Sequence, residues 1–151
     1  MAMIKEVYRF SELSAAKLYE ILRIRNEIFV VEQQSVYNDT DGHDLKALHY
    51  TYWQEGDLIA YSRILPPNSV YSLASIGRVC VRKSHRSQGL GRSLFAESLE
   101  ILENAFGKQP IKIQAQLYLK DFYEGFGFRS ITDAYDDCGI LHIDMVRDGI
   151  V

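Results

Sequence analysis

The sequence predicts one mixed α/β domain built on a central, mostly antiparallel sheet with helices packed against it. Its 151 residues, 47% of them hydrophobic, suit a single domain with its own core. Stretches of strand character alternate along the chain with segments of helical spacing. No repeat, low-complexity segment or long linker interrupts residues 1–151, so we expect one domain over the whole length.

The first half of the chain is expected to form a strand, a helix and a hairpin. Residues 3–10 have strand character, and Ser11 and Ser14 are alternative N-caps for the helix after them. That helix has apolar residues on one face at Leu18, Ile21, Leu22, Ile28 and Phe29. A polar loop over residues 34–46 follows. Residues 47–55 and 58–65 then form two strands around a turn at Gly56-Asp57.

The second half supplies a parallel pair of strands. A strand over residues 73–82 leads into a basic, glycine-containing turn and a helix over residues 90–106. Gly107 and Pro110 end this helix, and residues 111–116 form the next strand. A strand–helix–strand connection of this kind joins parallel strands. The chain then closes with a helix over residues 117–126 and strands over residues 128–135 and 139–147.

Composition and charge argue against several classes of function. The formal net charge is −3, which argues against a nucleic-acid or anionic-membrane binder. No stretch approaches the length of a membrane span, and the N-terminus lacks the apolar region of an export signal, so we expect a cytoplasmic protein. The two cysteines, Cys80 and Cys138, have neither zinc-site nor disulfide-framework spacing. We therefore expect free thiols and no metal.

The basic turn before residues 90–106 is the most informative part of the sequence. Gly89 and Gly91 have no Cβ, so a ligand can approach the backbone there closely. The first amides of a helix have no partner within it, and with the helix dipole they form an anion site suited to a pyrophosphate. Five basic residues crowd into this stretch of an otherwise acidic chain: Arg82, Lys83, His85, Arg86 and Arg92. A polyphosphate ligand explains that local reversal of charge.

Two nucleotide-binding motifs fit the turn poorly. The phosphate-binding loop of NTPases requires Gly-Lys-Ser/Thr, whereas Arg92-Ser93 follows Gly91 here. The dinucleotide fingerprint requires a third glycine, and Leu94 occupies that position. A nucleotide-binding protein is therefore a weak hypothesis. The non-functional interpretation is a helix with a glycine-rich first turn and solvated arginines.

The pattern Arg86-x-x-Gly89-x-Gly91 after the strand end Val79-Cys80-Val81 resembles the acyl-CoA signature of the GNAT N-acetyltransferase superfamily. Further segments resemble its ElaA-like branch: Phe29-Val30-Val31-Glu32-Gln33, Gln114-Ala115-Gln116, and residues 122–128 and 139–145. At Cys138 and Leu141 the chain departs from that branch, which usually has an acid and a proline there. The resemblance implies a GNAT-like sheet of about six to seven strands with about four helices, and a splayed parallel strand pair that binds acyl-CoA.

The resemblance also implies which residues hold the cofactor, acetyl-CoA. The loop amides hold the pyrophosphate, and the strand before them pairs its backbone with the pantetheine arm. The residues concerned are Val79, Cys80, Val81, Arg86, Ser87, Gln88, Gly89, Leu90, Gly91 and Arg92.

Two residues are candidates for proton transfer. Amine acetylation needs a neutral nucleophile and a proton for the leaving thiolate, and the resemblance implies that Tyr123 lies beside the coenzyme A sulfur as the acid. Glu32 is the candidate base, because burial after an apolar run raises a carboxyl pKa, here towards about 7. The alternatives are core packing for Tyr123 and an ordinary helix-end carboxylate for Glu32.

Three residues are candidates for acceptor contacts. Arg78 either contacts an anionic group of the acceptor or pairs with a carboxylate such as Glu32. His49 lies in an alternating strand and either faces the acceptor or packs in the core, and Tyr37 belongs to the loop matched by resemblance. The acidic loop from Asn38 to Asp44 either attracts a cationic amine or is a solvated turn; its spacing is not that of an EF-hand.

Two further residues keep two interpretations each. His142 either orients the cofactor end or supports the sheet. Cys80 invites a covalent mechanism, but a thiol on a central strand is usually a small buried hydrophobe, so direct transfer is favoured.

The sequence therefore favours an acetyltransferase that moves an acetyl group from acetyl-CoA to a primary amine, on a small molecule or a peptide N-terminus, by direct transfer in a ternary complex. A non-catalytic acyl-CoA sensor is the alternative, because the glycine loop fits both. We expect no nucleic-acid or membrane partner, and exposed edge strands make a homodimer reasonable.

Overall fold

Two four-stranded antiparallel sheets meet edge to edge in the computed structural model, which describes residues 2–149. The first sheet has the order β1-β2-β3-β4, and the second has β5-β8-β6 with β7 also paired to β8. The strands of the first sheet are β1 (Ile4–Arg9), β2 (Leu48–Gln54), β3 (Asp57–Leu65) and β4 (Ser75–Val81). Those of the second are β5 (Ile111–Gln116), β6 (Arg129–Ser130), β7 (Tyr135–Asp137) and β8 (Ile140–Arg147).

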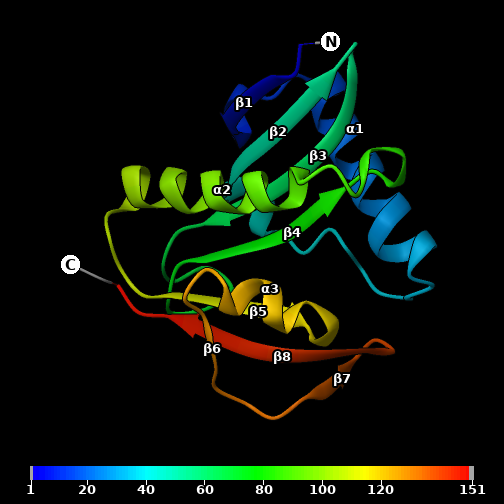
Figure 1. Cartoon of the computed structure of the whole chain (residues 1–151). Helices are drawn as coiled ribbons and strands as arrows, with labels where there is room; N and C mark the ends of the chain where they lie inside the picture. The colour runs from blue at the N-terminus through cyan, green and yellow to red at the C-terminus, as the bar shows by residue number, and fades with distance from the viewer. Residues whose placement is uncertain (1, 150–151) are drawn as a thin grey trace.

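The junction between the sheets is parallel and very short. Ala74 and Ile111 form a single parallel bridge, and the amide of Lys112 donates to the carbonyl of Ala74 over 2.9 Å. Beyond this point no ladder joins β4 and β5, and the two strands diverge (Figure 1). The predicted mixed α/β class and the splayed parallel pair are therefore confirmed. The predicted single sheet of about six to seven strands with about four helices is corrected to two sheets of eight strands in all, with three α-helices, within residues 2–149.

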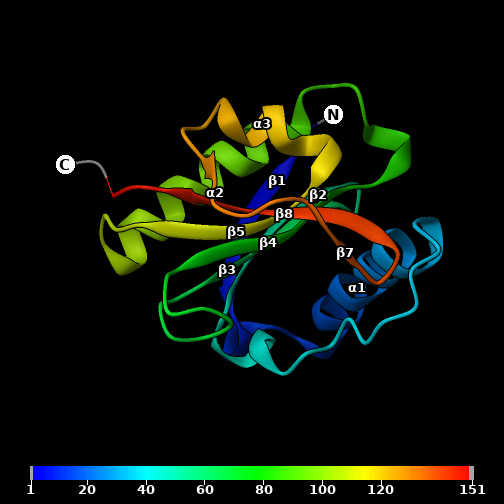
Figure 2. The ribbon, with the colours of Figure 1, turned by 90° about the horizontal axis from the view of Figure 1, so that it is seen from below.

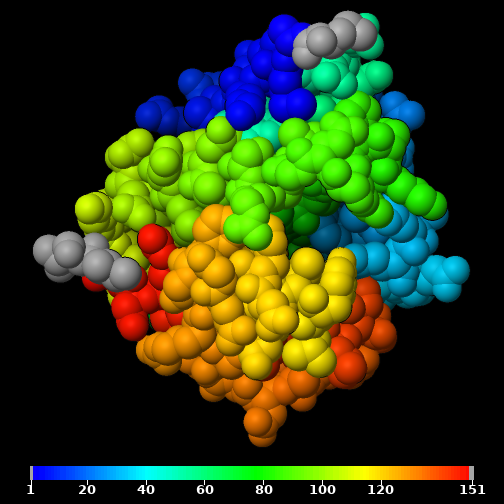
Figure 3. Space-filling model, viewed as in Figure 1, coloured from blue at the N-terminus to red at the C-terminus, as the bar shows by residue number. Residues whose placement is uncertain are grey.

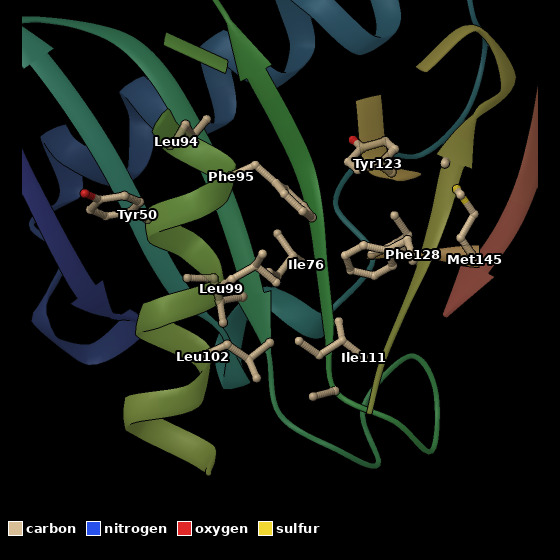
Figure 4. Close-up of a cluster of buried hydrophobic side chains, with 14 of the residues drawn as sticks. Tyr50, Ile76, Leu94, Phe95, Leu99, Leu102, Ile111, Tyr123, Phe128 and Met145 are labelled. Carbon is tan, nitrogen blue, oxygen red and sulfur yellow. The ribbon is translucent and has the colours of Figure 1, made fainter. Parts of the chain in front are cut away.

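Three α-helices cover the sheets within residues 2–149. Helices α2 (Leu90–Phe106) and α3 (Lys120–Glu124) lie on one face, and α1 (Ala15–Arg25) lies on the other (Figure 2). The main core forms between α2 and both sheets, where Phe95 packs against Tyr123 and Phe128 beside Ile76 of β4 (Figure 4). A smaller core lies under α1. Among the helices of the described residues, none is both long and apolar enough to cross a bilayer.

The first helix begins where the capping rule predicts and then changes character. Ser14 is the N-cap, and its Oγ accepts from the amide of Lys17 over 3.1 Å. After Arg25 the chain continues as a π-helix over Asn26–Glu32, and the amide of Gln33 reaches back five residues to the carbonyl of Ile28. A single widened turn of this kind is frequent at functional sites. Spacing alone predicts the helix but not this change of pitch.

Three local expectations need correction. The β2–β3 turn is centred on Glu55-Gly56, both with positive φ, one residue earlier than predicted. The predicted helix 117–126 is a 3₁₀ turn over Leu117–Leu119 followed by the short α3. The predicted strand 128–135 breaks into β6 and β7, because Thr132 Oγ1 accepts the amide of Asp144 and so replaces a backbone partner.

The remaining 3₁₀ turns connect the larger elements. They cover Phe10–Glu12, His43–Lys46 and Lys83–His85.

Candidate active site

A cavity of about 620 Å³ opens where β4 and β5 diverge. The surface is hollowed between the residues that lead into α2 and the α3 segment (Figure 3). Its walls come from the π-helix, β4, β5, α3 and the β7–β8 hairpin, and the polar lining residues include Glu32, Gln33, Ser35, Tyr37, Asp41, Arg63, Arg78, Arg86, Gln114, Gln116, Tyr123, Asp137 and His142. A cleft of this size holds a small ligand or the reactive end of a longer one.

Strand β4 carries a β-bulge in the wall of this cavity. Tyr61 pairs with Cys80 and Arg63 pairs with Gly77, so Arg78 and Val79 together oppose the single residue Ser62. Arg78 has φ +52°, in the left-handed region. A bulge leaves backbone groups outside the ladder and often lies beside a functional site. Here the two bulge residues, Arg78 and Val79, line the cavity beyond the point where β4 and β5 separate.

The turn before α2 leaves main-chain amides free, as predicted. Gly89 is the N-cap with φ +78°, and it provides no side-chain cap. The first bond of the helix runs from the amide of Ser93 to the carbonyl of Gly89 over 3.2 Å. The amides of Leu90, Gly91 and Arg92 therefore have no acceptor inside the helix, and the dipole of a 17-residue helix reinforces their positive potential.

Two of the basic residues near this turn are already engaged. Arg82 donates to the carbonyl of Leu58 over 3.0 Å and to Glu27 over 2.5 Å. Arg86 lines the cavity and donates through Nε to the carbonyl of Val81 over 2.9 Å. Arg82 therefore ties the turn to the first sheet, while Arg86 remains beside the cavity.

Arg92 is held differently from these two. Its guanidinium lies 5.7 Å from the ring centroids of both Phe122 and Phe126, in an exposed position at the first turn of α2. Together with the free amides, Arg92 fits a polyanionic ligand such as a pyrophosphate. Arg86 would join them by exchanging its Glu32 partner for the ligand.

Tyr123 combines a core position with access to the cavity. Its ring packs edge-on against Phe95 and Phe122, with centroids 5.0 and 5.2 Å away. The residue also lines the cavity, and within residues 2–149 its hydroxyl has no hydrogen-bond partner. Burial raises the pKa of Tyr123 well above its usual value. The hydroxyl therefore stays protonated and able to donate a hydrogen bond.

Glu32 lines the cavity, but its expected pKa shift is wrong in direction. Both terminal guanidinium nitrogens of Arg86 donate to the carboxylate of Glu32, one of them over 3.1 Å. This pairing lowers the pKa of Glu32 instead of raising it. The side chain also remains exposed, so the burial on which the expectation depended does not occur. A carboxylate held ionised by a cation is a weak proton acceptor.

The suggestion that His49 faces an acceptor is not supported. The ring is fully buried and does not line the cavity. Nδ1 lies 2.6 Å from the hydroxyl of Tyr61, and Nε2 lies 2.9 Å from the carbonyl of Asp44. Burial lowers the pKa of His49. Of its two interpretations, the structure supports the core histidine.

The acidic loop is partly exposed, but its carboxylates are paired with arginines, which neither interpretation anticipated. Arg25 is fully buried and binds Asp39 over 2.8 Å and Asp44 over 2.6 Å. Arg63 donates to both carboxylate oxygens of Asp41, each over 2.8 Å. These arginines come from α1 and β3 and neutralise a loop that looks acidic in the sequence.

Arg78 and Tyr37 do lie in the cavity wall, and they join the same network. Arg78 Nε lies 2.8 Å from Asp39, and its guanidinium lies 5.7 Å over the ring of Tyr37. Tyr37 donates to Asp39 over 2.8 Å. Of the alternatives for Arg78, the structure supports pairing with a carboxylate, although the partners are Asp39 and Asp41 and not Glu32.

Cys80 lies in the cavity wall but is buried. Burial raises the pKa of its thiol to about 12, so the nucleophilic thiolate is scarce at neutral pH. This argues against a covalent role.

Sequence reasoning missed most of one cavity wall. Gln114 and Asp137 line the cavity, and the amide of Gln114 donates to Asp137 over 2.8 Å. Gln33, which follows the π-helix, and Gln116 of β5 also donate hydrogen bonds to each other through their side-chain amides, over 3.1 and 3.0 Å. A signal was present, because the buried Ile111, Ile113 and Ala115 of β5 alternate with polar residues that must face the other way. Within the described part of the chain, no cluster of His, Cys, Asp or Glu suits a metal ion.

Comparison with known proteins agrees with the fold. The family model "Acetyltransferase (GNAT) domain" matches residues 15–148. Protein ElaA of Escherichia coli is 39% identical over 142 residues, covering 93% of each chain. A UPF0039 protein of Synechocystis sp. is 38% identical over 139 residues, covering 91% of this chain and 90% of the relative.

Solved structures agree as well. The crystal structure of E. coli ElaA matches with a TM-score of 0.91 at 36% identity, over 97% of this chain and 100% of that one. An acyl-CoA N-acyltransferase from Pseudomonas aeruginosa matches with a TM-score of 0.91 at 34% identity, over 97% of this chain and 99% of that one. The predicted resemblance is therefore confirmed, and the chain belongs to the GNAT acetyltransferase family, with ElaA-like proteins among its relatives.

Proposed function

We propose that this protein transfers the acetyl group of acetyl-CoA directly to a primary amine bound in the same cavity. The observation that carries the proposal is one continuous cavity that has the β4 bulge and the Tyr123 hydroxyl in its wall and the free α2 amides close to its Arg86 end. Family membership supports acyl-CoA as the donor. The similarity to an acyl-CoA N-acyltransferase supports a nitrogen acceptor.

The residues available suit each part of the donor. The amides of Leu90, Gly91 and Arg92 would hold the pyrophosphate, together with the Ser87–Gly89 turn and Arg86. The backbone of Val79, Cys80 and Val81 would pair with the pantetheine arm, because within residues 2–149 no strand lies on that side of β4 beyond the Ala74–Ile111 bridge. When bound, acetyl-CoA supplies an activated acetyl thioester.

The protein's own groups then promote transfer. The neutral amine nitrogen forms a C–N bond to the acetyl carbon, the C–S bond breaks, and the thiolate leaves. One proton leaves the nitrogen for solvent, and one is taken up by the sulfur. The free amides of the β4 bulge stabilise the negative charge that develops on the carbonyl oxygen. Tyr123 gives its hydroxyl proton to the departing sulfur and regains one from solvent, which balances the proton that the amine releases.

The test is thiol release from acetyl-CoA across a panel of primary amines. Tyr123→Phe is expected to lower turnover by about 10²–10⁴-fold, the contribution of one positioned acid, while acetyl-CoA still binds. Tyr118→Phe is the matched control, because Tyr118 also lines the cavity but is 75% exposed at its rim. Equal turnover for Tyr123→Phe and the control would remove Tyr123 from the chemistry. Tight acetyl-CoA binding without thiol release for any amine would favour the sensor instead.

A further inference from the structure

The ionised residues around the cavity balance one another with one exception. Glu32 pairs with Arg86. Asp41 pairs with Arg63 and Arg78. Each acid on this side of the cavity thus has a guanidinium partner.

The network behind these residues is neutral as well. Its three arginines, Arg25, Arg63 and Arg78, face three aspartates, Asp39, Asp41 and Asp44. The network therefore adds no net charge to the cavity.

Asp137 is the exception. It is the last residue of β7, lines the cavity and, among residues 2–149, forms no ion pair. Lys112 projects from the same face of β5 as Gln114, but its ammonium group lies 3.5 Å from Asp144 and 4.5 Å from the ring centroid of Tyr71. Asp137 therefore places in the cavity wall a carboxyl group that has no cationic partner among residues 2–149.

Two other residues of the cavity lining, Gln114 and His142, supply hydrogen-bond acceptors. Gln114 uses its amide nitrogen to donate to Asp137 over 2.8 Å, because a carboxylate only accepts, and this leaves its Oε1 free to accept. His142 also lines the cavity, and its Nδ1 lies 2.8 Å from the carbonyl of Ile140. Nδ1 must carry the hydrogen in that bond, so Nε2 of the neutral ring is an acceptor. This wall thus offers a carboxylate, an amide oxygen and a ring nitrogen, which match the three N–H donors of an ammonium group.

An ammonium group held by Asp137 cannot be the amine that reacts. A neighbouring carboxylate favours the protonated form of an amine, whereas acetyl transfer needs the neutral form. We propose that Asp137, with Gln114 and His142, binds a second positive charge on the acceptor, so that the substrates are amines with an additional cationic group, such as α,ω-diamines. This inference rests on the proposed amine acetylation and specifies its substrate class.

The test measures binding to the coenzyme A complex by calorimetry, so it does not depend on turnover. The probes are α,ω-diamines with three to six methylenes, each compared with the monoamine in which a methyl group replaces one amine. The wild-type protein is expected to bind the best diamine about tenfold or more tighter than its matched monoamine, the effect of one charge-assisted hydrogen bond. Asp137→Asn should abolish this preference, and Asp137→Glu should retain part of it.

Asp136→Asn is the control. Asp136 is the adjacent acid in β7, is exposed, and does not line the cavity. Equal affinity for diamines and monoamines in the wild-type protein would overturn the inference, as would equal losses in the two Asn variants. Failure of the proposed function is a separate result, because it would appear as no thiol release with any amine. Calorimetry would still test whether Asp137 makes the protein prefer diamines to monoamines.

Discussion

Replacing Gly89 with alanine tests the anion site with little other disturbance. Gly89 has φ +78° and ψ +8°, and a Cβ built there meets no atom within 4 Å. The substitution therefore adds backbone strain without a clash. A non-glycine residue in the left-handed region costs about 1–2 kcal/mol, which lowers Tm by roughly 2–8 °C in a domain of this size.

The effect on acetyl-CoA binding should be larger than the effect on stability. Strain at Gly89 is relieved by turning the peptide planes that follow it, which are those that present the amides of Leu90 and Gly91. Loss of one hydrogen bond to a charged phosphate costs about 1.5–3 kcal/mol, or about 10–150-fold in Kd. Calorimetry with acetyl-CoA measures the affinity, and thermal melting measures the stability.

Gly56→Ala is the matched control for this experiment. Gly56 has φ +84° in the β2–β3 turn, its Cβ would also meet nothing within 4 Å, and it lies outside the turn that begins α2. Both variants should melt lower, but only Gly89→Ala should bind acetyl-CoA more weakly. If Gly89→Ala melts lower yet binds acetyl-CoA as tightly as the wild-type protein, the amides of this turn do not hold the ligand.

Three further predictions concern the other candidate residues. Glu32→Gln should leave kcat within about tenfold of wild type, whereas loss of a true base would cost about 10²–10⁴-fold. Acetyl-CoA should bind at least as tightly, because the substitution releases Arg86. A larger loss of kcat would restore Glu32 as the base. The lowered pKa of His49 means that the unfolded chain binds a proton at this residue more readily than the folded protein does, so stability should fall as pH drops below about 6.5. In His49→Gln, the Tm from melting curves should depend less steeply on pH in that range. An unchanged slope would contradict the interpretation of His49 as a buried core histidine. Cys80→Ala should retain turnover in the thiol-release assay, since burial keeps the thiol protonated; complete loss in a folded variant would indicate covalent transfer.

Several parts of the fold follow from local sequence signals. The α2 boundaries match the prediction, because Gly89 and Gly107 adopt backbone conformations that stop a helix at both ends. The β5 strand also matches its predicted bounds. The break between β6 and β7 was not predictable in this way, since it depends on a hydrogen bond between Thr132 and the distant Asp144.

The candidate site likewise has some features set by consecutive residues and others set by residues far apart in the chain. The glycine turn and its free amides are properties of consecutive residues. By contrast, the pKa of Glu32 is set by Arg86, 54 positions along the chain. The contact between Asp137 and Gln114 depends on the β7–β8 hairpin, which brings together residues 23 positions apart in the chain.

The sequence by itself determined the succession of strands and helices, the anion-binding turn at the start of α2 and the resemblance to acyl-CoA-dependent transferases. These features depend on periodicity and backbone conformation, which act between near neighbours in the chain. Only the tertiary structure decided which charges are neutralised, because electrostatic interactions depend on separation in space and on burial and not on separation in sequence. The acidic loop around Asp41 is therefore paired with arginines, while Asp137 lines the cavity without an ion-pair partner among residues 2–149.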